Sequence, residues 1–353
     1  MLLSLVSVGG LPHLAGELNW EVSIAVAAAA ALLAGMCTGL VLRYARRRLI
    51  DQVNERSSHA VPTPRGGGLG LVVGLVLSVL PFLVATSAWP AVGAVLAVLA
   101  MAAVGWWDDH ADLSPRFRLG LQFLLVLVAL TGVGWLSQAS LGPWTMSAPW
   151  WVVGPILVVG GVWMVNLTNF MDGIDGIAGS QGLVAGAGLS LLIAQAGGDP
   201  AWVVLGAGLA GASSGFLWWN APPAKIFMGD VGSTALGLAF AVLVVAAVRV
   251  RVPLDAALLP ILPFICDATA TLIRRAWRRE RLSQAHRSHL YQRLARAWGS
   301  HRLVTLLWCG WAALGVILAL AEQSERLSHG LGLLICLLVF AVLVGIGRRV
   351  APA

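Results

Sequence analysis

The sequence predicts an all-α, polytopic integral membrane protein with about 11 transmembrane helices. Of its 353 residues, 58% are hydrophobic and 11% are charged, and the mean hydropathy is +0.84. A soluble protein of this length would carry about a quarter charged residues. Apolar runs long enough to cross a bilayer recur along the whole chain. The composition therefore disfavours the alternative, a soluble all-helical protein with buried helices.

The apolar runs form a single transmembrane domain, residues 1–353, whose longest connection, 274–301, is too short for a soluble domain. The first twenty residues lack a basic n-region and a small-residue cleavage site, so we interpret them as an exposed segment rather than a signal peptide. The predicted spans are 22–42, 67–87, 90–106, 118–136, 150–167, 178–195, 201–218, 232–249, 254–273, 302–320 and 329–347.

The charge distribution predicts the orientation of these spans. With the N-terminus outside, the inner loops collect 20 of the 23 Lys and Arg residues, and basic residues concentrate on the cytoplasmic side of membrane proteins. The prediction is N-out and C-in, and it places an active site, if the protein has one, on the cytoplasmic face. The cytoplasmic loops are predicted at approximately residues 43–66, 106–118, 166–178, 219–232 and 274–301.

Two further features narrow the class of protein. The four cysteines lie inside apolar runs without metal-ligand spacing, which favours packed thiols over disulfides. No internal repeat is evident, which disfavours an inverted-repeat transporter.

The stretch 166–179, NLTNFMDGIDGIAG, places two amides and two carboxylates between apolar runs. Asn, Asp and Gly loosen a helix, so we predict a helix end at the membrane surface. Asn169 and Asp172 are three residues apart and share one face of any helical turn. Polar groups beside hydrocarbon are costly, so these two residues, together with Asn166 and Asp175, form a candidate functional site.

The first two cytoplasmic loops add basic and acidic candidates. PTPRGGG, at 62–68, is a glycine turn whose N–H groups could approach an anion. The arginines at 43–48 are interpreted as a membrane anchor. The adjacent carboxylates Asp108 and Asp109 repel each other unless a metal ion, Arg116 or Arg118 lies nearby, and a solvated helix end is the alternative.

The last two cytoplasmic loops each have two interpretations. Asp230, flanked by glycines after Lys225 and Phe227, is either a functional acid or a helix N-cap. The basic loop 274–301 could clamp a phosphate or pyrophosphate, or hold anionic lipid headgroups. Asp267, about two turns before the inner end of its span, is an intramembrane acid that needs a partner.

Together the five loops offer carboxylates, amides, glycine turns and guanidiniums on one face of one membrane. This set suits a metal-bridged phosphoryl transfer, in which catalysis is mostly positioning and charge stabilisation. Mg²⁺ takes few protein ligands together with substrate oxygens, which fits scattered carboxylates.

The motif order is also informative. NxxNxxDGxDG and then FMGDxGS, preceded by a DD loop and by PTPRxGG, resembles the polyprenyl-phosphate N-acetylhexosamine-1-phosphate transferases, over about residues 43–300. The resemblance implies transfer of HexNAc-1-phosphate from a UDP-HexNAc to undecaprenyl phosphate, with release of UMP, in the bacterial inner membrane. It implies Mg²⁺, with Mn²⁺ as a substitute, contact with inner-membrane lipids and no nucleic acid; a homodimer stays open.

The resemblance also implies roles for individual residues. Asp230 and Asn169 match the Mg²⁺ ligands, and Phe227 matches the aromatic residue that stacks on uracil. The acids matched to catalytic positions are Asp108, Asp109, Asp172 and Asp175. The residues expected to bind substrate are Arg56, His59, Thr63, Arg118, Asn166, Phe227, Arg287, His289 and Arg293.

One departure from the family bears on the substrate. Its last cytoplasmic loop usually carries an HxHH cluster, aligned here with HLYQ, so that Tyr291 and Gln292 replace two histidines while His289 remains. RSHLYQ looks more like the branch that starts O-antigen synthesis with GlcNAc, QuiNAc or FucNAc phosphates. The alternatives are the phospho-MurNAc-pentapeptide translocase and a lipid or solute transporter.

Overall fold

The computed structural model of the chain describes residues 20–51, 62–111, 113–280 and 286–350. Within these ranges eleven helical segments are long and apolar enough to cross a membrane, which confirms the predicted number of spans. They are α2 (Trp20–Arg48), α3 (Gly68–Ala85), α4 (Trp89–Ala111), α5 (Pro115–Val133), α6 (Trp150–Phe170), α7 (Ile177–Gln195), α8 (Pro200–Asn220), α9 (Asp230–Arg249), the segment from α10 to α11 (Leu254–Trp277), α13 (His301–Gln323) and α14 (Leu331–Val350). The four cysteines are free thiols, as expected.

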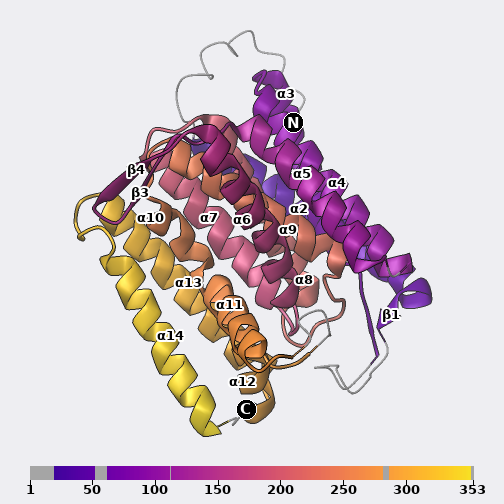
Figure 1. The fold of residues 1–353 in the computed structure, drawn as a ribbon. Helices are drawn as coiled ribbons and strands as arrows, with labels where there is room; N and C mark the ends of the chain where they lie inside the picture. Colours follow the sequence, from indigo (N-terminus) through magenta and orange to yellow (C-terminus); the bar gives the residue numbers. More distant parts are fainter. Residues whose placement is uncertain (1–19, 52–61, 112, 281–285, 351–353) are drawn as a thin grey trace.

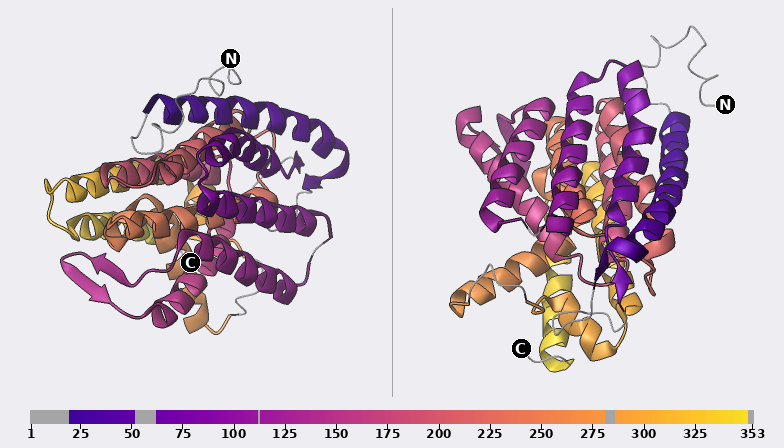
Figure 2. Two further views of the ribbon diagram at one scale, coloured as in Figure 1. Left: turned by 90° about the horizontal axis from the view of Figure 1, so that it is seen from above. Right: turned by 90° about the vertical axis from the view of Figure 1, so that its right-hand side faces the viewer.

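Helix α9 lies inside the bundle (Figures 1 and 2). It packs on α3, α4, α5, α6 and α7, and its residues from Val231 to Val248 are all buried. A helix that is apolar on every side is shielded from water, either by protein or by a bilayer, and α9 is shielded by protein. Its first residue, Asp230, is consequently surrounded by the ends of neighbouring helices.

Small residues allow the helices to approach closely. Gly211 and Gly215 of α8 lie against the backbone of α2, where an added Cβ would come within 2.0 Å of the carbonyl oxygens of Ala27 and Ala31. Helices in a bilayer associate through such close van der Waals packing, because lipid tails remove the hydrophobic driving force between them.

The predicted span 254–273 is longer than expected and is not one straight helix. It consists of α10 (Leu254–Leu258), the 3₁₀ turn η2 (Leu259–Ile261) and α11 (Leu262–Trp277). Pro260 and Pro263 account for the break, since proline has no N–H to donate to the preceding turn. At its lower end α11 leaves the bundle obliquely (Figure 2, right).

The two ends of the bundle carry different short elements (Figure 1). One end has the hairpin of β3 (Gln138–Leu141) and β4 (Trp144–Ser147). The opposite end has the antiparallel pair β1 (Ile50–Asp51) and β2 (Thr63–Pro64), and helix α12 (Leu290–Trp298). The acids at the ends of α4, α6 and α9 gather at this second end, which we call the site end; that it faces the cytoplasm stays a prediction.

Candidate active site

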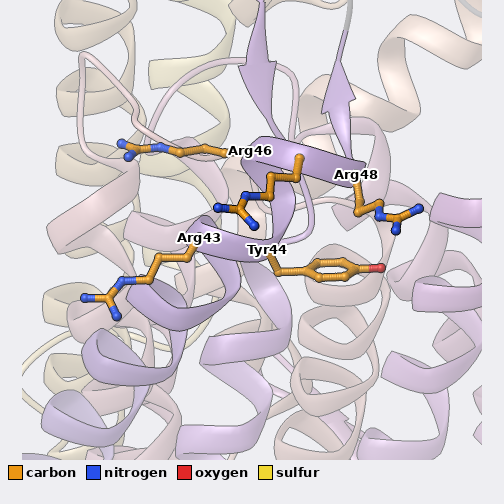
Figure 3. A pocket seen from close by; sticks show the side chains of 5 residues that line it. Arg43, Tyr44, Arg46 and Arg48 are labelled. Atoms are coloured by element: carbon orange, nitrogen blue, oxygen red, sulfur yellow. The ribbon is translucent and has the colours of Figure 1, made fainter.

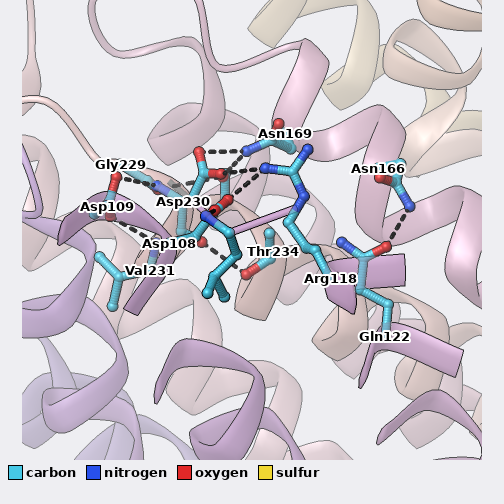
Figure 4. Close-up of polar contacts among 12 residues, drawn as sticks. Asp108, Asp109, Arg118, Gln122, Asn166, Asn169, Gly229, Asp230, Val231 and Thr234 are labelled. Atoms are coloured by element: carbon cyan, nitrogen blue, oxygen red, sulfur yellow. Dashed lines mark hydrogen bonds and ion pairs between the residues drawn. The ribbon is translucent and has the colours of Figure 1, made fainter. Parts of the chain in front are cut away.

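The site is built where α4 ends, α5 and α9 begin, and α6 ends (Figure 4). The sequence suggested that Asp108, Asp109 and Asp230 lie in loops, but they belong to the last turn of α4 and the first turn of α9. Gly105 makes this meeting feasible, because a Cβ there would lie 2.3 Å from the carbonyl oxygen of Asp230. The absence of a side chain lets α4 lie directly against the start of α9.

Arg118 joins two of the predicted acids. Its guanidinium forms a short ion pair with Asp108 and lies 3.4 Å from the carboxylate of Asp230. Asn169 donates from Nδ2 to Asp230 at 2.8 Å and to the hydroxyl of Ser233 at 2.9 Å. Residues 112 positions apart therefore form one polar cluster, with Arg118 and Asp230 still about one third exposed.

Asp109 has a different environment from its neighbour. Its buried carboxylate accepts the backbone N–H groups of Asp230 at 3.3 Å and Val231 at 3.1 Å. These are among the first N–H groups of α9, which have no acceptor within the helix. Arg65 lies 3.9 Å from the same carboxylate and donates to the Asp109 carbonyl oxygen at 2.6 Å. Asp109 thus fastens α4 and the glycine turn to the start of α9.

Asp172 and Asp175 lie in the turn between α6 and α7, which confirms the predicted helix end. Burial raises the pKa of Asp172 well above its usual value, and the neighbouring charges of Asp230, Asp109 and Asp175 raise it further. Asp175 accepts the N–H of Ala224 at 3.0 Å and lies 3.2 Å from Nδ1 of His301. Asp172 therefore belongs electrostatically to the acid cluster, whereas Asp175 holds the turn to the loop before α9 and to α13.

The glycine turn serves packing more than anion binding. The N–H groups of Gly67 and Gly68 donate to the carbonyl oxygens of Phe227 and Met228, each at 2.9 Å. The expectation that these two groups approach an anion is therefore wrong, because the loop before α9 uses them. Thr63 is buried in β2.

Three other predicted substrate residues lie beside the acid cluster or outside the described part of the chain. Asn166 donates to Gln122 of α5 at 2.7 Å, and this pair lies beside the acid cluster (Figure 4). Arg56 and His59 fall in the range 52–61, outside the described residues.

The last loop contains a helix that the sequence analysis did not predict, α12. His289 is its N-cap and is buried, with its ring stacked on Phe170. Arg293 is also buried and donates to the carbonyl oxygen of Gly347 in α14 at 3.2 Å. Arg287 is partly exposed next to the start of α12. One guanidinium nitrogen of Arg293 is therefore used in a contact between α12 and α14.

The arginines at the end of α2 surround a surface cavity of about 710 Å³ at the site end (Figure 3). Arg46 also lines a second cavity of about 440 Å³, together with Thr63, Pro64 and Lys225. Lys225 lies 5.3 Å from the ring centroid of Trp219, within the range of a cation–π contact. These cavities place basic side chains at the same end of the bundle as the polar cluster.

Sequence reasoning missed three residues of the site. Gln122 and His301 each contact a predicted residue, and Tyr291 donates to the Phe170 carbonyl at 3.0 Å. The i, i+4 spacing of Arg118 and Gln122 on one face of α5 was the signal available for Gln122. The others depend on contacts between distant segments.

The donor set fits a hard divalent cation. Asp230, Asp172 and Asp108 offer carboxylate oxygens, and Asn169 offers an amide next to Asp230. Within the described residues, no group of three or more His, Cys, Asp or Glu side chains is arranged to hold a metal ion by itself. Mg²⁺ suits such an open arrangement, because it commonly takes one or two carboxylates and completes its shell with water and substrate phosphates.

An open acidic cluster with a guanidinium, at one end of an apolar helical bundle, is suited to binding phosphate groups at a membrane surface. The fold and the site define an integral membrane enzyme of the phosphoryl-transfer class. Comparison with known proteins agrees: the profile of glycosyl transferase family 4 matches residues 91–248. The chain belongs to the polyprenyl-phosphate N-acetylhexosamine-1-phosphate transferases.

Three relatives illustrate the membership. A decaprenyl-phosphate N-acetylglucosaminephosphotransferase of Mycobacterium tuberculosis (strain CDC 1551 / Oshkosh) is 31% identical over 326 residues, 81% of this chain and 80% of the relative. A probable undecaprenyl-phosphate N-acetylglucosaminyl 1-phosphate transferase of Bacillus subtilis (strain 168) is 28% identical, over 84% of this chain and 83% of the relative. A phospho-N-acetylmuramoyl-pentapeptide-transferase of Thermosynechococcus vestitus is 35% identical, over 64% of this chain and 62% of the relative.

Proposed function

We propose that this enzyme transfers HexNAc-1-phosphate from a UDP-N-acetylhexosamine to undecaprenyl phosphate, giving undecaprenyl-diphospho-sugar and UMP. The observation that carries the proposal is Arg118, which lies between Asp108 and Asp230 beside Asn169. A guanidinium held between two acids has a fixed direction, and it binds phosphate oxygens without first being ordered. The named relatives that act on polyprenyl phosphates support the same substrate class.

The reaction needs little covalent help from the protein. A lipid phosphate has a second pKa of about 6, so at about pH 7 it is already a nucleophilic anion. One of its oxygens attacks the β-phosphorus of the UDP-sugar; a P–O bond forms there while the bond to the UMP oxygen breaks, and UMP leaves with the electron pair. The chief obstacle is repulsion between the two phosphate groups, which Arg118 offsets.

The other polar residues act by position. Asp230, Asn169 and Asp172 would hold Mg²⁺, which when bound neutralises pyrophosphate charge. Asp108 orients Arg118 through their ion pair, and in this proposal it also accepts the proton of an incoming lipid phosphate. Asp109 and Asp175 keep the start of α9 and the turn after α6 in place.

The proposed place of this reaction is the cytoplasmic face of the bacterial inner membrane, as the first membrane step of O-antigen or another cell-envelope polysaccharide. The basic side chains at the site end, including Arg46 and Lys225, support a cytoplasmic location. Because one relative is a pentapeptide transferase, UDP-MurNAc-pentapeptide is the second candidate donor for this enzyme. The RSHLYQ sequence of the last loop favours a smaller UDP-HexNAc.

The test is to supply the purified protein with undecaprenyl phosphate, Mg²⁺ and a panel of UDP-sugars that includes UDP-MurNAc-pentapeptide. Product lipids are identified by mass and UMP is measured. We expect UMP and a lipid diphosphosugar with one UDP-HexNAc. If only UDP-MurNAc-pentapeptide is turned over, it replaces the proposed donor. If no donor releases UMP, the proposed function is wrong and the transporter interpretation remains.

A further inference from the structure

Asp267 of α11 holds the start of α12, although the two residues whose backbone N–H groups it accepts are more than twenty positions away. Its side chain is 1% exposed; Oδ1 accepts the N–H of Leu290 at 2.7 Å and Oδ2 accepts the N–H of Tyr291 at 2.9 Å. The first N–H groups of a helix have no partner within it. His289, the N-cap residue, provides no side-chain hydrogen bond to the helix, so Asp267 supplies the cap from another helix.

Tyr291 continues this connection to the polar end of α6. It is fully buried, and its hydroxyl donates to the carbonyl oxygen of Phe170 at 3.0 Å. Phe170 ends α6, directly after Asn169 and two residues before Asp172. Asp267 and Tyr291 therefore form a brace that joins α11 through α12 to the candidate site.

Gly173 shows how closely the brace fits. A Cβ at this position would lie 2.1 Å from the hydroxyl oxygen of Tyr291 and 2.9 Å from Nε2 of Gln292. Only glycine lets the turn after Asp172 lie directly against α12. Gln292 also lines a cavity of about 240 Å³ with Arg296 and His301, and His301 is the residue paired with Asp175.

We propose that Asp267 and Tyr291 are positioning residues that fix α12 against the turn at 171–176 and thereby set the binding of the sugar nucleotide. The proposal rests on the proposed function for the identity of that substrate. Neither residue touches reacting atoms. They act because a helix with an uncapped, buried N-terminus would lose its fixed place, and Gln292 and Arg296 would move with it.

The chain offers matched controls for both residues. Asp255 lies on the same broken span, is 2% exposed and accepts a backbone N–H, that of Gly142 in the hairpin at the opposite end of the bundle. Tyr44 is the other of the two tyrosines and is exposed. Asp267→Asn is therefore compared with Asp255→Asn, and Tyr291→Phe with Tyr44→Phe.

The experiment measures kcat and KM separately for each substrate, and hydrogen exchange of the backbone amides in 290–298. We expect Asp267→Asn to raise KM for the UDP-sugar by at least about tenfold. This is the change that the loss of one charge-assisted hydrogen bond would cause. Tyr291→Phe should raise it by about three- to tenfold. KM for undecaprenyl phosphate should stay within about twofold, the α12 amides should exchange faster, and both controls should match the wild type.

Any result other than these would contradict part of the proposal for Asp267 and Tyr291. Faster exchange with unchanged KM would make the brace purely structural, and unchanged exchange would remove the brace itself. Equal losses for both substrates, matched by Asp255→Asn, would indicate general destabilisation instead of positioning. A wild type that releases no UMP from any UDP-sugar would overturn the proposed function, while the exchange measurement would still decide whether Asp267 holds α12.

Discussion

The carboxylate of Asp109 accepts the backbone N–H of Asp230 at 3.3 Å, so an acid at the end of α4 caps the helix that another acid begins. Adjacent carboxylates thereby divide their tasks. Asp108 points to Arg118, whereas Asp109 points to the backbone of α9. The two acids should therefore respond differently to substitution.

Replacing Asp109 should cost stability. Asp109→Ala leaves two N–H groups at a buried helix start without their acceptor, and should lower the free energy of unfolding by about 1–3 kcal/mol. Asp109→Asn keeps one acceptor and should lose less. Thermal unfolding in detergent measures both. The control is Asp199→Ala, which removes an exposed cap of α8 and should cost about 1 kcal/mol. An unfolding temperature equal to wild type for Asp109→Ala would contradict the capping role.

Arg118 should matter far more than its neighbour Arg116. Arg118→Ala removes the guanidinium between Asp108 and Asp230, and should lower kcat/KM by about 10- to 100-fold, corresponding to about 1.5–3 kcal/mol. Arg116 is exposed two residues earlier, and Arg116→Ala should remain within about twofold of wild type. Steady-state kinetics of UMP release compares them. Equal losses in the two variants would point to a general effect of basic charge near the membrane.

Activity should depend on a divalent cation held at Asp230. EDTA should abolish UMP release, and added Mg²⁺ should restore it. Asp230→Asn should remove nearly all activity, because a charged oxygen ligand beside Asn169 is lost. Turnover is measured over a series of Mg²⁺ concentrations. A variant with near-normal turnover in limiting Mg²⁺ would show that Asp230 is not a ligand.

The pH dependence distinguishes two roles of Asp108. As a base, Asp108 would be needed only while the lipid phosphate carries a proton, so the deficit of Asp108→Asn should shrink as pH rises past the second phosphate pKa of about 6. As a residue that only orients Arg118, it should show a constant deficit. Comparing kcat/KM of wild type and variant from about pH 6 to about pH 9 separates the two. We expect the shrinking deficit.

Gly173 should not tolerate a side chain. In Gly173→Ala the new Cβ would overlap the buried hydroxyl of Tyr291, and overpacking of this kind costs about 1–3 kcal/mol of stability. Gly160 of α6 has open space around its Cβ position. Gly160→Ala should therefore be neutral or stabilise the helix by up to about 1 kcal/mol. Thermal unfolding of both variants tests the close packing of α12, and equal behaviour would contradict it.

Much of the architecture is determined by the sequence alone. Hydropathy and helix length are local properties, so eleven spans and the grouping of acids at their ends could be predicted. The motif order further indicated the family. The glycine turn shows the limit of local reasoning: three consecutive glycines can expose N–H groups to an anion, but the loop before α9 uses those of Gly67 and Gly68.

Tertiary structure decided which polar group meets which. Asp108 and Asp230 are far apart in sequence, and Arg118 contacts both because Gly105 lets α4 lie against the start of α9. Asp267 finds its partners in α12, a helix with no apolar span to reveal it. The depth and direction of each helix follow from non-local packing, and a hydrogen bond requires its two atoms within about 3 Å. No pattern along the chain specifies distances that small.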